Sequence, residues 1–175
     1  MKINTKKICL LGIGIALFVT LSMCFRVPVF ENYYLCLGYI VMAVYCYSIG
    51  MLSGTLVGVL GTILYCFLIN GLRGMPGWAI GNIVIGIILG CTFKLTKKLK
   101  NKWLKIIINT AVIVVSVAIG ILGVKSCVEM ALYSQPFLIR ISNNIYAFVA
   151  DIVVLIISIP ICKIVDKIVK KQNLI

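Results

Sequence analysis

The sequence contains no histidine and only four acidic residues among its 175 residues. The absence of histidine excludes zinc sites and haem sites that use imidazole ligands. It also excludes a serine nucleophile that is activated by an imidazole. The Gly-x-x-x-x-Gly-Lys-Ser/Thr phosphate loop is absent too, so the chain has no motif for hydrolysing ATP by itself. We therefore predict a protein that is not an enzyme and has no metal or cofactor of its own.

Charged residues are also scarce, at 12% of the chain, whereas 62% of the residues are apolar and the mean hydropathy is +1.16. Soluble domains carry about 25% charged residues. A chain with so few polar side chains cannot cover a surface that faces water, and the bilayer must be its solvent. The composition predicts an all-α integral membrane protein with a single transmembrane domain over residues 1–175.

The eight cysteines form no Cys-x-x-Cys pair, and most of them lie inside apolar runs. In such runs a free cysteine behaves as a small hydrophobic residue. The pattern does not support a zinc site or a disulfide framework.

Six apolar runs approach the length of about 20 residues that a helix needs to cross a bilayer. The break between the second and third runs depends on "SIGMLSG" alone, and the fourth run is short. The sequence therefore predicts a six-transmembrane-helix bundle. The predicted spans are Ile8–Phe25, Tyr33–Ile49, Met51–Ile69, Trp78–Phe93, Ile106–Val124 and Ile145–Ile161.

The basic residues, which give a net charge of +13, divide unequally between the two sides of this bundle. Thirteen lysines fall at one set of helix ends, near the two termini and between the fourth and fifth spans. Four cations fall at the other ends: Arg26, Arg73, Lys125 and Arg140. Cytoplasmic loops are the ones enriched in lysine and arginine, so both termini are predicted to be cytoplasmic. This distribution favours membrane anchoring and argues against binding to nucleic acid.

Small residues recur at intervals of four in three of the predicted helices. In lipid, this spacing lets two helix backbones approach closely. For Gly50, Gly54 and Gly58, and for the glycines of the fourth helix, we expect packing inside the bundle. For Gly12, Ala16 and Thr20 in the first helix, internal packing and a face for a partner protein are both open.

A small set of polar residues is expected near the outer side, and several of them could contact a ligand there. The segment "NGLRGMPGWAIGN" is predicted to be an outer hairpin that holds Arg73, Trp78 and Asn82 over the mouth of the bundle. The candidate ligand-binding residues are Arg26, Asn70, Arg73, Trp78, Asn82, Arg140, Asn144 and Asp151.

Three of these candidates, Asp151, Trp78 and Asn82, also have a purely structural interpretation. Asp151 can form the floor of an outward-facing pocket, or it can pair with Arg140 or Arg73 to tie helices together. Trp78 and Asn82 suit a small heteroaromatic ligand, but such a tryptophan is commonly an interfacial aromatic and such an asparagine an interhelical hydrogen bonder.

Several features of the sequence, taken together, resemble those of a known family. Six short helices, the small-residue stripe of the first helix, the "RVP" at Arg26–Pro28 and "GMPGWAIGNIVIGIILG" at Gly74–Gly90 resemble the substrate-binding S component of an energy-coupling factor (ECF) transporter. The likeness is strongest from Gly12 to Phe93. It assigns no ligand contacts, since no substrate-specific pattern is present.

The resemblance implies a mechanism as well as a location. An S component of a bacterial cell membrane captures a vitamin or similar micronutrient from outside, then docks on a transmembrane coupling subunit that two ATPase subunits power. Docking in the family uses an AxxxA pattern of the first helix, which corresponds to Gly12 and Ala16 here, with glycine replacing the first alanine.

Vitamin uptake is thus the leading hypothesis, and two others stay open. One is a membrane enzyme acting on a lipid or peptide with Asp151, Glu129 or Glu31 as acid or base. The other is an accessory membrane subunit without a ligand, whose core would be filled by side chains.

Overall fold

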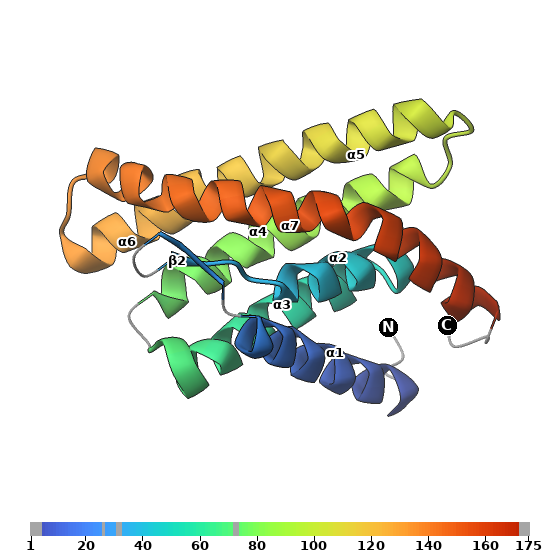
Figure 1. Cartoon of the computed structure of the whole chain (residues 1–175), viewed down its shortest axis with the longest axis horizontal. Helices are drawn as coiled ribbons and strands as arrows, with labels where there is room; N and C mark the ends of the chain where they lie inside the picture. The colour runs from blue at the N-terminus through green and yellow to red at the C-terminus, as the bar shows by residue number, and fades with distance from the viewer. Residues whose placement is uncertain (1–4, 26, 31–32, 72–73, 172–175) are drawn as a thin grey trace.

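The computed structural model describes residues 5–25, 27–30, 33–71 and 74–171, and most of these residues are helical (Figure 1). The elements in chain order are α1 (Thr5–Cys24), β1 (Pro28–Phe30), β2 (Tyr33–Tyr34), α2 (Gly38–Ser48), α3 (Met51–Tyr65), the π-helical η1 (Cys66–Asn70), α4 (Met75–Thr96), α5 (Lys102–Val117), the π-helical η2 (Ala118–Lys125), α6 (Ser126–Tyr133) and α7 (Phe137–Lys171). The predicted all-helical class is confirmed, apart from one short strand pair.

Within the described residues, five helices are long and apolar enough to cross a membrane. They are Thr5–Cys24, Met51–Ile69, Met75–Thr96, Lys102–Tyr133 and Phe137–Lys171. The remaining apolar helix, α2, has 11 residues, which is fewer than the roughly 17 that a crossing needs. The predicted count of six crossings is therefore not confirmed.

The start of the second helix was predicted wrongly. Instead of beginning a helix at Tyr33, the chain forms strand β2, which pairs antiparallel with β1 through Pro28 and Tyr34. The amide of Leu35 also donates to the carbonyl of Val27 over 2.9 Å. Aromatic and β-branched residues suit a strand, and proline cannot donate a ladder hydrogen bond but is tolerated at a strand's first residue. The helix begins only at Gly38.

The break after the second helix is confirmed. Helix α2 ends at Ser48 and α3 begins at Met51. Between them, Gly50 has φ = 136°, a backbone conformation that residues with a Cβ rarely adopt. The fourth, fifth and sixth helices are each longer than predicted, at Met75–Thr96, Lys102–Tyr133 and Phe137–Lys171. Their polar ends continue the helix beyond the apolar run, so hydropathy alone marks only the middle of each.

Helix α2 lies in the middle of the bundle and packs against α1, α3, α4 and α7. Its Tyr39 and Met42 are completely buried. The glycines of α3 and α4 allow this close packing. A Cβ on Gly54 would lie 2.5 Å from the backbone nitrogen of Cys46, and a Cβ on Gly90 would lie 2.5 Å from the Cα of Met51. The predicted role in internal packing is confirmed for Gly54, Gly58 and the glycines of α4. It is wrong for Gly50, where a Cβ would meet no described atom within 4 Å and the glycine instead serves the turn between α2 and α3.

The two ends of the bundle differ in charge. The start of α1, the end of α4, the start of α5 and the end of α7 all lie at one end (Figure 1). These are the segments that carry the lysine clusters. There, Asp166 of α7 accepts from Lys97 of α4 and from Lys170, each at 2.7 Å. The charge division predicted from the sequence therefore corresponds to one lysine-rich end and one lysine-poor end of the folded chain.

Candidate functional site

A cavity of about 230 Å³ opens at the lysine-poor end of the bundle. Its walls come from the ends of α1, α3 and α4, from β2 and the loop after it, and from η2, α6 and α7. The lining residues are Ser22, Tyr34, Leu35, Cys36, Tyr65, Gly74, Trp78, Ile121, Lys125, Glu129, Arg140, Ala147 and Asp151. Residues far apart in the sequence thus meet around one hollow.

Of the two π-helical segments, η2 contributes Ile121 and Lys125 to the cavity lining. Segment η1 directly follows Tyr65, the last residue of α3, which also lines the cavity. In η2, a Cβ on Gly120 would lie 2.6 Å from Ile85, so the glycine lets this segment lie against α4. π-Helical turns are rare and often occur at functional sites, because the wider turn redirects side chains.

One wall of the cavity is aromatic and is held by a chain of hydrogen bonds. The indole N–H of Trp78 donates to the hydroxyl of Tyr39 over 2.8 Å. That hydroxyl donates to Oδ1 of Asn82 over 2.7 Å, and Nδ2 of Asn82 donates to Oγ1 of Thr62 over 2.7 Å. Tyr65 meets the Trp78 ring edge-on, with the ring centroids 5.9 Å apart. Because the indole donor is used inside the protein, Trp78 offers a ligand its flat ring.

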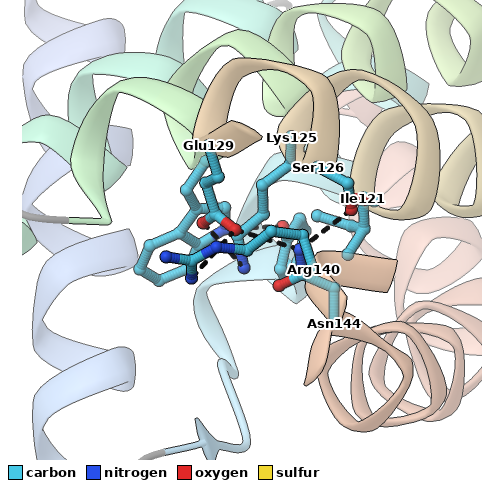
Figure 2. Close-up of polar contacts among 8 residues, drawn as sticks. Ile121, Lys125, Ser126, Glu129, Arg140 and Asn144 are labelled. Atoms are coloured by element: carbon cyan, nitrogen blue, oxygen red, sulfur yellow. Dashed lines mark hydrogen bonds and ion pairs between the residues drawn. The ribbon is translucent and has the colours of Figure 1, made fainter. Parts of the chain in front are cut away.

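Another part of the lining is charged, and Figure 2 shows the polar contacts among its side chains. The Glu129 carboxylate of α6 lies 3.9 Å from Nζ of Lys125 and 3.8 Å from Nη1 of Arg140 on α7. Nδ2 of Asn144 donates to Oε2 of Glu129 over 3.1 Å and to Oγ of Ser126 over 3.0 Å. Lys125 and Glu129, which are four residues apart, thus belong to a larger buried network that joins η2, α6 and α7.

Asp151 lies deeper on α7 and is only 4% exposed. It borders the cavity, whereas the ion pair of Arg140 is made with Glu129. The predicted alternative, a pair of Asp151 with Arg140 that ties helices together, is therefore not observed, and both residues lie on α7. The other predicted partner, Arg73, lies outside the described residues. A carboxylate at this depth of a membrane protein is costly and usually faces a partner or a wet cavity. Here it faces the cavity.

The predicted ligand-binding residues fall into three groups. Trp78, Arg140 and Asp151 line the cavity. Asn82 and Asn144 are completely buried and hold other site residues in place. Arg26 and Arg73 lie outside the described residues, and for Asn70 the structure gives only its position at the end of η1.

Sequence reasoning missed Tyr39, Thr62 and Tyr65, which fix the aromatic wall. Each is a single polar or aromatic residue inside an apolar helix, and its partner lies far away in the sequence. A hydroxyl inside an apolar helix must find a hydrogen-bond partner, and this was the signal available for Tyr39 and Thr62.

The small-residue stripe of α1 faces outward. Gly12, Ala16 and Thr20 are all exposed, and a Cβ on Gly12 would meet no described atom within 4 Å. Gly14 has the opposite role, since a Cβ there would lie 2.6 Å from the ring of Tyr45. The interpretation of this stripe as a face that packs inside the chain is therefore wrong.

These features define a multi-pass helical membrane protein with a polar and aromatic cavity at one end of the bundle. The sequence matches the family model for the ECF-type riboflavin transporter, S component, over residues 2–167, and the chain belongs to this family. The family consists of transporter subunits that bind a vitamin, which agrees with the prediction that the chain is not an enzyme. No curated protein matches the chain.

Proposed function

We propose that the protein is the substrate-binding subunit of an ATP-driven ECF transporter and captures a riboflavin-type vitamin in the cavity at its lysine-poor end. The family match supports the class of ligand. The observation that carries the site is a hollow lined both by aromatic side chains and by charged side chains. A ligand-free accessory subunit would instead have a core filled by side chains.

Within this proposal, the residues have separate roles. Trp78 supplies an apolar ring face for a flat heterocycle, and Asp151 accepts a hydrogen bond from its polar edge. Arg140 faces the other part of the ligand. Asn82 and Asn144 position Trp78 and Glu129 without touching the ligand. Arg26, Asn70 and Arg73 are proposed as further ligand contacts on the basis of the sequence alone.

The orientation and partners complete the proposal. The lysine-rich end faces the cytoplasm, so both termini are cytoplasmic. Strand β2 and helix α2 together, rather than α2 alone, then carry the chain through the membrane for the sixth time, inside the bundle. The lysine-poor end then faces the outside of a bacterial cell. The outward face of α1, with Gly12, Ala16 and Thr20, docks on a transmembrane coupling subunit that two ATPases drive.

Ligand binding by the purified, detergent-solubilised protein tests this function directly. We expect riboflavin fluorescence to be quenched in a saturable manner, and the vitamin to be found by mass spectrometry after denaturing extraction. Trp78→Phe should weaken binding. The matched control is Trp103→Phe, because Trp103 is 76% exposed at the lysine-rich end. Absence of riboflavin binding, or an equal effect of the two substitutions, would contradict the proposal.

A further inference from the structure

The cavity continues outward into a second hollow of about 540 Å³. Gly74, Glu129 and Arg140 line both hollows and so form a neck between them. The outer hollow is completed by the end of α6 and the turn before α7, including Tyr133. Ligand pockets usually measure about 300–1,000 Å³. The inner cavity alone is smaller than this range, so a vitamin-sized ligand has to extend through the neck.

Arg140 is held at the neck with its hydrogen-bonding capacity largely unused. Its side chain is 19% exposed, and its buried Nε has no hydrogen-bond partner among the described residues. The 3.8 Å from Nη1 to Oε2 of Glu129 is too long for a hydrogen bond. The guanidinium carbon lies 4.9 Å from the centroid of the Tyr133 ring, which supports the planar group from one face. A guanidinium has five N–H donors.

Glu129 pairs electrostatically with Arg140 but does not accept a hydrogen bond from its guanidinium. Its carboxylate is fixed by Nδ2 of Asn144 and is shared with Lys125. At 3.8 Å from Glu129, the partly exposed guanidinium still offers N–H donors at the neck. A ligand group that accepts hydrogen bonds is therefore favoured there.

The side chains at the neck also indicate which acceptor fits. Glu129 lines the neck beside Arg140, and its carboxylate lies 3.8 Å from Nη1 of Arg140. A carboxylate or phosphate of the ligand would be repelled by Glu129, whereas a hydroxyl oxygen accepts from the guanidinium without bringing a second negative charge.

We propose that Arg140 is the residue that recognises a hydroxylated tail of the ligand at the neck, while the flat ring system occupies the inner cavity against Trp78. The inference rests on the proposed function and deepens it. Riboflavin has this form, since a chain of hydroxyl-bearing carbons extends from its fused rings. The same geometry makes Arg140 indifferent to a ring system that lacks the tail.

The test compares riboflavin with lumichrome, the ring system without the hydroxylated chain, in the wild type and in Arg140→Gln. A lost hydrogen bond to a charged donor corresponds to a loss of roughly 10-fold or more in affinity. We expect that loss for riboflavin, with the lumichrome affinity changed by less than about 2-fold. Arg140→Lys, which keeps the charge but not the planar fork, should recover only part of the riboflavin affinity.

Retained lumichrome binding also shows that the variant is folded. If Arg140→Gln alone does not fold, the double variant Glu129→Gln/Arg140→Gln removes both charges of the pair and should show the same selective loss. Equal losses for the two ligands, or an unchanged riboflavin affinity, would overturn the role of Arg140 and leave the proposed function standing. A wild type that binds neither ligand would overturn both.

Discussion

Asn82 uses every part of its side-chain amide inside the protein. Oδ1 accepts from Tyr39, and Nδ2 donates to Thr62 at 2.7 Å and to the carbonyl of Gly58 at 3.4 Å. The residue therefore joins α4 to α2 and α3 and sets the position of the Tyr39 hydroxyl, on which the Trp78 ring depends. A side chain that looks like a ligand contact in the sequence stabilises the wall behind the site.

We expect Asn82→Ala to destabilise the protein by about 2 kcal/mol, because it leaves buried hydroxyl groups without a partner. The measurement is thermal unfolding in detergent, followed by circular dichroism. Asn143→Ala is the matched control, since Asn143 is exposed on α7 and its substitution should leave the melting temperature unchanged. A similar melting temperature for both variants would rule out the structural role of Asn82.

Among single residues, the sequence correctly identified Trp78, Arg140 and Asp151 as lining the site. Polar residues are rare in this apolar chain, so each of them is a candidate for a functional or structural role. The sequence could not distinguish these three from Asn82 and Asn144. All five lie near the lysine-poor ends of their helices, and only the rotation of each helix decides whether a side chain faces the cavity or a neighbouring helix. That rotation depends on contacts such as Tyr39 with Asn82, which are 43 residues apart in the sequence.

The helices themselves are arranged by their glycines. The third and fourth helices pack closely because glycines face their neighbours, and the sequence predicted this from the spacing alone. What it could not predict is that α2 has only 11 residues. The residues before α2 are as apolar as those of the predicted helices. Tyr33 and Tyr34 are nevertheless extended, because they pair with strand Pro28–Phe30.

The two kinds of glycine should respond differently to the same substitution. A Cβ on Gly54 would lie 2.5 Å from the backbone nitrogen of Cys46, whereas one on Gly12 meets no described atom within 4 Å. Gly54→Ala should therefore cost about 1–3 kcal/mol by overpacking. Gly12→Ala should be neutral or slightly stabilising, because alanine favours the helix. Urea or thermal unfolding in the same detergent compares the two, and equal effects would contradict the packing assignment.

Considered as a whole, the molecule has two different ends. The lysine-poor end contains the cavity, and at the lysine-rich end Asp166 of α7 pairs with Lys97, which directly follows α4, and with Lys170 of its own helix. Charge distribution in the sequence predicted this division well, because the rule that sorts lysines acts on whole segments and not on individual contacts. The cavity is a property of the assembled bundle and has no counterpart in any single segment.

The outward face of α1 gives the prediction that separates capture from transport. Gly12 and Ala16 are exposed and small, so Gly12→Leu or Ala16→Leu should leave the fold and riboflavin affinity unchanged while abolishing uptake into cells that contain the complete transporter. The reason is steric, since a leucine on this face keeps the helix of the coupling subunit from approaching closely. Val115→Phe on α5, at a side chain that is 53% exposed, adds similar bulk elsewhere and should transport normally. Loss of riboflavin binding in the α1 variants would show that this face serves the ligand site, and normal uptake would show that docking uses another surface.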